Sequence, residues 1–305
     1  MNGVIVVNKP EGFTSFDVVA VMRKLCNERK IGHCGTLDPN ATGVLPVLLG
    51  RAAKAQDILP NHDKTYLATF VLGKVTDTLD IWGEVKAEEK TQVKKEDLLC
   101  VLPEFTGEIE QIPPMYSAVQ VNGKRLYDLA RQGIEVERKA RKITVYSLEL
   151  ISFDEETQSG SMRVACSKGT YIRTLLDDIA KKFCIGGCMT SLVRESACGF
   201  TLDVSYTLDE LRTLSESGEI EKTLLSTESL FVTYKEVKVS AVQAKRFANG
   251  GALSIDRIRE KPEFSDGEIC RVKSPDGIFM GLGKFDAESR ELKIYKQFAD
   301  YAQFN

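Results

Sequence analysis

Residues 32–46 read GHCGTLDPNATGVLP. This loop holds a single carboxylate, Asp38, and one of the two histidines of the chain, His33, among turn-forming Gly, Pro, Asn and Thr. A lone aspartate in such a stretch is more often a turn-former than a catalyst. Here the small neighbours would let a substrate approach Asp38 closely. The loop is therefore the first candidate for a functional site.

The runs on either side of this loop predict strands and helices in an irregular order. Continuous apolar character or period-two alternation predicts strands, whereas apolar residues on one helical face predict helices. Without regular βαβ spacing, this order favours an α+β fold with a largely antiparallel sheet. The expected strands cover residues 3–10, 43–50, 64–73, 141–153 and the start of 161–183, and the expected helices cover residues 14–29, 51–59, 94–105 and the end of 161–183.

The pattern changes near residue 233. A short helix over 240–251 is followed by hairpin-like runs with PDG and DAESR as turns. We therefore expect two domains, one over 1–232 and a small β-rich one over 233–305. The acidic stretch SESGEIEKTLLSTES (215–229) predicts a helix on the linker side of this boundary.

Charge and hydropathy narrow the class of protein. The 305 residues carry a net charge of −3, which points to no polyanionic partner, but residues 121–145 carry seven Lys/Arg against three Asp/Glu. Such a block is compatible with phosphate contacts. No apolar run approaches the roughly 20 residues that span a bilayer, and the N-terminus lacks the basic region of a signal peptide. We expect a cytoplasmic monomer without a membrane partner.

Motifs for cofactor and metal chemistry are missing from the sequence. Eight cysteines are scattered without framework spacing, which is typical of reduced, mostly buried thiols. Cys184 and Cys188 lie close together, but both histidines are distant in sequence, so a zinc site is not expected. The chain has no Walker-type phosphate loop, no G-x-G-x-x-G after a strand and no G-x-S-x-G elbow. We therefore expect no metal and no nucleotide cofactor.

A second candidate site lies in SKGTYIRT (167–174). Tyr171 and Arg173 are two residues apart and would face the same side of an extended stretch. An arginine that reaches a buried carboxylate can bind it bidentately and keep it ionised. Taken alone, the stretch would describe only a surface arginine beside a half-buried tyrosine.

Two more stretches hold candidate residues. Tyr66, in KTYLAT, is either a packing residue of a strand or a stacking platform for a base. Asp77 and Asp80, in TDTLD, are either turn acids or ligands of ribose hydroxyls.

Five stretches, in this order, resemble the TruB family of RNA pseudouridine synthases, and they span the chain from its N-terminus to about residue 200. The matching stretches are VNKPEGFTSFDVV (7–19), GHCGTLDPNATGVLP (32–46), DKTYLATFVLGKVTDTLDIWG (63–83), IPPMYSAVQVNGKRLYDLARQGIEV (112–136) and CSKGTYIRTLLDDIA (166–180). The resemblance implies the α+β pseudouridine synthase fold, a mixed, mainly antiparallel sheet with a central cleft. Residues 112–142 resemble the thumb-like insert of the bacterial stand-alone branch more than the branch that uses guide RNA. Residues 233–305 resemble a PUA-type RNA-binding domain.

The resemblance also implies roles for single residues. Asp38 is similar to the catalytic aspartate of the family, Arg173 to the arginine paired with it, and Tyr66 to the tyrosine that stacks on the target base and manages a proton at its C5. Cys34 departs from the family pattern, because many members carry Thr there, and it leaves a thiol near the site. The resemblance assigns the remaining matches to RNA or substrate binding. They are His33, which helps to hold the flipped-out RNA, the base-contacting Tyr171, the pocket-wall Leu192, Asp80 as polar support of the site, and Lys9, which with Pro10 matches an N-terminal motif that we take as structural support.

The bacterial stand-alone branch of the family isomerises uridine 55 in the T-loop of elongator tRNAs. The resemblance therefore implies a tRNA pseudouridine synthase that binds the T-arm and uses neither a cofactor nor a guide RNA. Two other classes stay open: an RNA-binding protein or tRNA chaperone on the same fold, and a hydrolase that uses Asp38 with Asp80. Retention of Asp38, Tyr66 and Arg173 together argues against pure binding, and no motif holds the carboxylate pair of a hydrolase.

Overall fold

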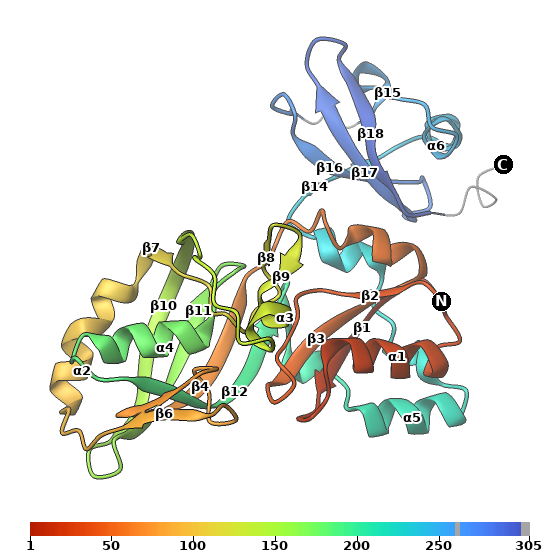
Figure 1. Cartoon of the computed structure of the whole chain (residues 1–305). Coiled ribbons are helices and arrows are strands. Elements are labelled where there is room, and N and C mark those ends of the chain that lie inside the picture. Colours follow the sequence, from red (N-terminus) through yellow and green to blue (C-terminus); the bar gives the residue numbers. More distant parts are fainter. Residues whose placement is uncertain (260–262, 300–305) are drawn as a thin grey trace.

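The computed structural model describes residues 1–259 and 263–299. Its main sheet has the strand order β1-β3-β12-β4-β11-β10-β7 (Figure 1). Along this order β3 and β12 pair in parallel, whereas the other neighbours are antiparallel, so the expected α+β fold with a mixed, mainly antiparallel sheet is confirmed. These strands are β1 (Gly3–Lys9), β3 (Thr42–Leu49), β4 (Lys64–Leu72), β7 (Gly107–Gln111), β10 (Arg141–Asp154), β11 (Ser159–Cys166) and β12 (Gly187–Ala197), with β2 (Ile31–His33) beside β3, β13 (Phe200–Thr201) beside β12, and the separate hairpin of β5 (Lys74–Thr76) and β6 (Val85–Glu88).

The apolar patterns of the strands match the faces that they bury. In β1, Val4 and Val6 belong to one hydrophobic cluster while Ile5 and Val7 belong to another, so both faces of this strand are covered. The alternating strand β4 buries only every second side chain. A strand that is buried on both faces reads as a continuous apolar run, and a half-buried one alternates.

Helices cover the two halves of the sheet separately. α1 begins after Thr14, which forms a capping box with Asp17, and it packs beside α5 against the β1–β3 half. α4 buries Leu175 and Ile179 in the cluster under β4, β10 and β11 (Figure 1). In the described ranges 1–259 and 263–299, no helix is long and apolar enough to cross a membrane. The α-helices are α1 (Ser15–Leu25), α2 (Lys95–Val101), α3 (Leu126–Ala130), α4 (Ile172–Lys181), α5 (Leu208–Glu216) and α6 (Ala241–Ala248).

Three elements differ from the sequence-based expectations. The helix expected over 215–229 is wrong, because this stretch forms two short 3-10 turns and the α-helix, capped by Thr207, precedes it. The short helix expected over 51–59 is a 3-10 helix over residues 50–55. Strand β12 was not predicted, although it joins the two halves of the sheet.

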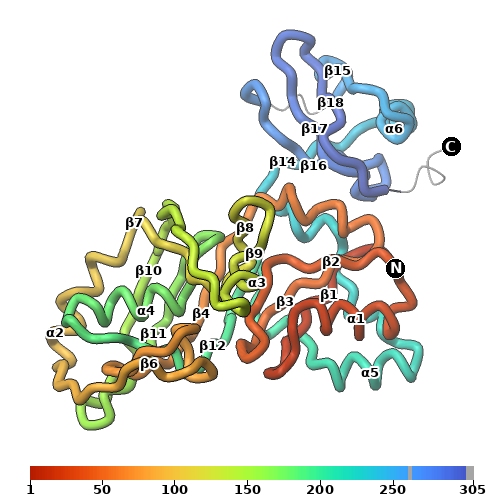
Figure 2. Tube along the Cα trace, viewed as in Figure 1, coloured from red at the N-terminus to blue at the C-terminus, as the bar shows by residue number. Residues whose placement is uncertain are grey.

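The insert over residues 112–142 lies between the two halves of the sheet. It holds the short hairpin of β8 (Gln120–Val121) and β9 (Lys124–Arg125), followed by α3. Figure 2 shows this segment crossing in front of β4 and β12, so that it faces the central part of the sheet. Leu126 and Leu129 are buried and hold the helix in place.

A second sheet begins at Lys235, with the strand order β14-β16-β17-β18-β15, and α6 packs on it. Its strands are β14 (Lys235–Lys238), β15 (Leu253–Ser254), β16 (Ile269–Lys273), β17 (Phe279–Asp286) and β18 (Glu291–Gln297). Phe231, fully buried, joins it to the first domain, because its ring lies 6.0 Å from that of Phe279 and 5.4 Å from that of Phe298. The two domains therefore share a hydrophobic cluster.

Candidate active site

A cavity of about 350 Å³ opens where the 35–38 loop, β4, β12, the insert and the start of α4 meet. Segments that are far apart in sequence supply its walls. The candidate residues on these walls are Asp38, Tyr66, Tyr171, Arg173 and Leu192. The fold thus brings five of the sequence-predicted site residues to one place.

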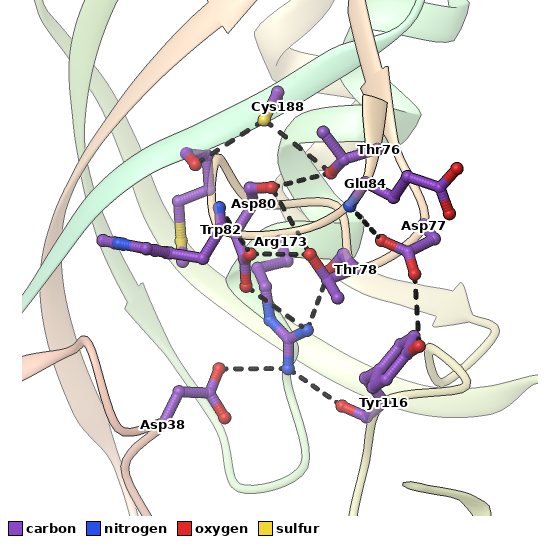
Figure 3. Close-up of polar contacts among 11 residues, drawn as sticks. Asp38, Thr76, Asp77, Thr78, Asp80, Trp82, Glu84, Tyr116, Arg173 and Cys188 are labelled. Atoms are coloured by element: carbon purple, nitrogen blue, oxygen red, sulfur yellow. Dashed lines mark hydrogen bonds and ion pairs between the residues drawn. The ribbon is translucent and has the colours of Figure 1, made fainter. Parts of the chain in front are cut away.

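Asp38 and Arg173 form an ion pair in this cavity, with 3.0 Å between Oδ2 and Nη2. The side chain of Arg173 is 6% exposed, whereas that of Asp38 is 42% exposed. The expected bidentate contact with a buried carboxylate is wrong, because a single ion-pair contact joins the two groups and Asp38 is partly exposed. The guanidinium also donates to the carbonyl oxygens of Thr78 at 2.8 Å and Tyr116 at 3.0 Å (Figure 3). Arg173 is therefore anchored independently of Asp38.

Asp80 lies on the other side of the same guanidinium. Its Oδ2 is 3.7 Å from Nη1 of Arg173, and its Oδ1 accepts hydrogen bonds from the hydroxyl of Thr78 at 2.6 Å and from the backbone N–H of Trp82 at 3.2 Å (Figure 3). The side chain is 13% exposed. Asp80 therefore neutralises the buried side of Arg173, while Asp38 faces the cavity.

Tyr171 and Arg173 do not lie on an extended stretch, so that expectation is wrong. Tyr171 is the N-cap of α4, and Arg173 belongs to the first turn of this helix. Gln111 fixes this start, because its side chain accepts from the N–H of Tyr171 at 2.8 Å and donates to its carbonyl oxygen at 3.0 Å. Both Tyr171 and Arg173 nevertheless line the cavity.

Tyr66 and Leu192 come from the adjacent strands β4 and β12. They are 6% and 7% exposed and line the cavity. Burial raises the pKa of Tyr66 to about 12, although the guanidinium of Arg194 beside its hydroxyl opposes this shift. The phenol is therefore protonated at neutral pH.

Arg194 was not predicted from the sequence, yet it is fully buried under the 35–38 loop. Its guanidinium donates to the carbonyl oxygens of Gly35 at 3.1 Å, Thr36 at 3.4 Å and Val44 at 2.7 Å. It therefore fixes the backbone that leads to Asp38. The only signal in the sequence was an arginine inside VRESA, which does not predict a strand.

Lys9 lies in the interior and not on an RNA-facing surface, so its assignment among the binding residues is wrong. Its side chain is fully buried. The ammonium donates to the carbonyl oxygens of Pro10 at 2.8 Å, Phe13 at 2.5 Å and Pro39 at 2.8 Å. Burial lowers its pKa to about 8. Lys9 holds the chain next to Asp38, which agrees with the structural support expected of this motif.

His33 ends β2, ahead of the cavity wall that begins at Gly35. Burial, followed by the charge of Arg194, lowers the pKa of its imidazole. Within the described part of the chain, its Nδ1 is buried without a hydrogen-bond partner. Its expected contact with RNA stays a prediction.

Comparisons with known proteins agree on one family. Residues 23–172 match the model of the TruB family pseudouridylate synthase, N-terminal domain. A protein named tRNA pseudouridine synthase B from Clostridium perfringens is 43% identical over 295 residues, which are 96% of this chain and 98% of that protein. Its namesake from Bacillus pumilus is 40% identical and covers 92% of each chain.

Solved structures share the same fold. The chain matches a protein in the crystal structure of a Cbf5-Nop10-Gar1 complex with a TM-score of 0.76 and 25% identity, over 99% of this chain and 86% of that one. A second match, in an archaeal box H/ACA sRNP Nop10-Cbf5 complex, has a TM-score of 0.74 and 24% identity, over 100% of this chain and 88% of that one. The match thus extends over both sheets.

Proposed function

This chain belongs to the TruB family of pseudouridylate synthases, and on that premise we propose that it converts uridine 55, in the T-loop of elongator tRNAs, to pseudouridine. The relatives named above carry tRNA in their names. The observation that supports the chemistry most directly is the Asp38 carboxylate, held by Arg173 in a cavity that Tyr66 and Leu192 also line. We expect the reaction in the cytoplasm, on the T-arm and without a guide RNA.

The reaction breaks the bond between ribose C1′ and uracil N1, turns the base and joins C1′ to C5. No atoms are lost and no redox change occurs, so one carboxylate can suffice and no cofactor is required. Asp38 either attacks C1′ or removes a ribose proton. Both roles need an ionised carboxylate, and the guanidinium of Arg173 holds that charge when the substrate excludes water.

Tyr66 is proposed to stack on the turned base and to manage the proton that leaves C5. A phenol with a pKa of about 12 is protonated at neutral pH and can accept the C5 proton only as the phenolate, which the Arg194 guanidinium beside its hydroxyl stabilises. Tyr171 and Leu192, on the same cavity, are proposed to bound the base on its other sides.

The RNA path is proposed to continue from the cavity toward the insert. A neighbouring cavity of about 490 Å³ shares Asp38 and Arg173 and is lined by Trp82, Tyr127 and Arg131. Extruding a base costs a few kcal/mol, and stacking on one aromatic ring returns about 1–3 kcal/mol. The aromatic and cationic groups of this second cavity would supply the rest of the free energy needed to extrude the base. His33 and the domain over 233–305 are proposed to add RNA contacts.

The proposal is tested with unmodified elongator tRNA that carries tritium at C5 of uridine. The wild type should release tritium to water and leave pseudouridine at position 55, whereas Asp38→Asn should release none and still bind the tRNA. Asp57→Asn, an exposed aspartate away from the cavity, is the matched control and should behave as wild type. Tight binding by the wild type without release would instead support an RNA-binding protein.

A further inference from the structure

Two cysteines lie together at the edge of the proposed catalytic cavity. Cys34 precedes the 35–38 loop, and Cys198 lies in the turn between β12 and β13. Both belong to one hydrophobic cluster, and each thiol shifts the pKa of the other. Cys198 lines the cavity, whereas Cys34 is 3% exposed and lies behind it. The proposed isomerisation uses neither thiol.

Two cationic side chains flank this pair. A side-chain atom placed on Gly35, the neighbour of Cys34, would lie 3.1 Å from Cε of Lys64 and 3.4 Å from Nη1 of Arg194. The neighbouring Cys34 thiol, followed by the charges of Lys64 and Arg194, lowers the pKa of Cys198. The neighbouring Cys198 thiol, together with burial, raises the pKa of Cys34. The thiolate therefore forms on the cavity side.

We propose that Cys34 and Cys198 form an oxidation site on the wall of the catalytic cavity, with hydrogen peroxide as the oxidant. The Cys198 thiolate attacks one peroxide oxygen, the O–O bond breaks, and the hydroxide that leaves takes up a proton to become water. Cys34 then loses its proton and attacks the sulfur of the Cys198 sulfenic acid, and the S–O bond breaks with release of a second water. Two thiols are oxidised to one disulfide as one peroxide is reduced to two waters.

The disulfide would tie the start of the catalytic loop to the turn after β12. A disulfide brings its two sulfurs to about 2.05 Å, closer than two thiols that are not bonded to each other. Moving Cys34 would shift the backbone of Gly35, whose carbonyl oxygen accepts a hydrogen bond from Arg194. The shift would pass along the 35–38 loop to Asp38. Because displacement by about 1 Å can lower a rate about 100-fold, we expect oxidation to reduce turnover by that order and a dithiol reductant to restore it.

The test uses the full chain with Cys100 and Cys184 replaced by serine, because these two thiols are exposed and would react first. After treatment with hydrogen peroxide, peptide mass spectrometry should find a disulfide between Cys34 and Cys198, and reductant should reverse it. This readout does not depend on the proposed function, whereas the loss of tritium release does. A disulfide from Cys198 to Cys166, or no disulfide at either thiol, would overturn the assignment.

Two variants separate the roles of the thiols. Cys34→Thr restores the residue common in the TruB family and should keep its turnover, but its oxidation should stop at a sulfenic acid that dimedone traps on Cys198. Cys198→Ser should trap no dimedone and resist peroxide. Equal inactivation of wild type and both variants by peroxide would contradict the proposal, because the loss would then arise elsewhere.

Discussion

The guanidinium of Arg173 has partners in three segments of the chain: the carbonyl oxygens of Thr78 and Tyr116 and the carboxylates of Asp38 and Asp80. Planar geometry lets one side chain serve all of them at once. Its position is therefore set before substrate arrives, and only the bond to Asp38 faces the cavity. The charge that balances Asp38 is thus fixed in place.

Arg173→Lys tests this arrangement. A lysine ammonium cannot reach two carbonyl oxygens and two carboxylates together, so we expect kcat to fall about 100-fold while the tRNA dissociation constant changes little. Arg163→Lys is the control, because Arg163 pairs with Glu195 at 2.9 Å on the exposed side of the sheet and should keep full activity. Near wild-type turnover of Arg173→Lys would contradict the paired role.

Lys9 predicts a pH dependence of stability. Its pKa is about 8 in the folded chain against 10.5 for a free lysine. Because the folded pKa is lowered, the unfolded chain binds more protons between these values, and the free energy of unfolding rises with pH in this window. From pH 7.5 to 9.5 we expect this group to add about 2 kcal/mol.

Urea unfolding at both pH values measures this term, with Lys9→Met as the reference, because the variant lacks the titrating group. As pH rises, the free energy of unfolding of the wild type should increase relative to that of Lys9→Met. A constant difference would mean that Lys9 is not perturbed in the folded chain.

Among the elements, β12 connects the two halves of the main sheet. It pairs with β3 over only Val193↔Thr42 and Arg194↔Gly43, and it pairs with β4 along most of its length. Gly43 has a φ of +105°, and a Cβ there would lie 2.3 Å from the carbonyl oxygen of Arg194. Only glycine fits this junction without a backbone shift.

Gly43→Ala should therefore destabilise the chain by about 3 kcal/mol or more, as measured by chemical denaturation. Gly218→Ala is the matched control, because Gly218 also has a positive φ, +74°, but a Cβ there meets nothing within 4 Å. The control should lose only about 1 kcal/mol. Equal losses would show that backbone strain, and not the strand contact, governs both positions.

Sequence patterns predicted those elements whose own residues show a clear apolar pattern or a helix cap. β1 is a continuous apolar run, β4 alternates and α1 has a cap, so each was found. β12 was missed because Thr190, Ser191 and Glu195 interrupt its apolar pattern, and its neighbours in the main strand order, β3 and β4, lie more than a hundred residues away. Arg194 was missed with it, and Lys9 was misassigned because no local pattern shows that its ammonium is enclosed by carbonyl oxygens.

At the scale of the whole molecule, the two domains are joined by a shared core and by charge. Phe231 packs on aromatic rings of the second sheet. Glu228, beside it, forms ion pairs with Arg271 and, at 2.9 Å, with Lys273 of β16. Deletion of residues 233–305 would uncover this core, so the RNA contacts proposed for the second domain are better tested by surface variants of the full chain.

This joint predicts that the domains unfold together. Hydrogen exchange in urea should give the same free energy of opening for β4 and for β17, because unfolding of either domain would expose the hydrophobic cluster that both share. Phe231→Ala should remove about 3–5 kcal/mol and separate the two values. Distinct values in the wild type would show instead that the domains open independently.

The partial exposure of Asp38 has a kinetic consequence. Water still solvates the carboxylate in the free protein, and a substrate must displace it before the charge gains full strength. For the proposed reaction we expect a free nucleoside to leave water at the rim of the cavity and a folded RNA arm to exclude it. The binding free energy of contacts far from the target base would then offset the cost of removing water from Asp38. Shortening the RNA should therefore lower kcat as well as affinity. In the proposed reaction the hydrated carboxylate would thus discriminate between substrates by size, and turnover would depend on the whole RNA arm.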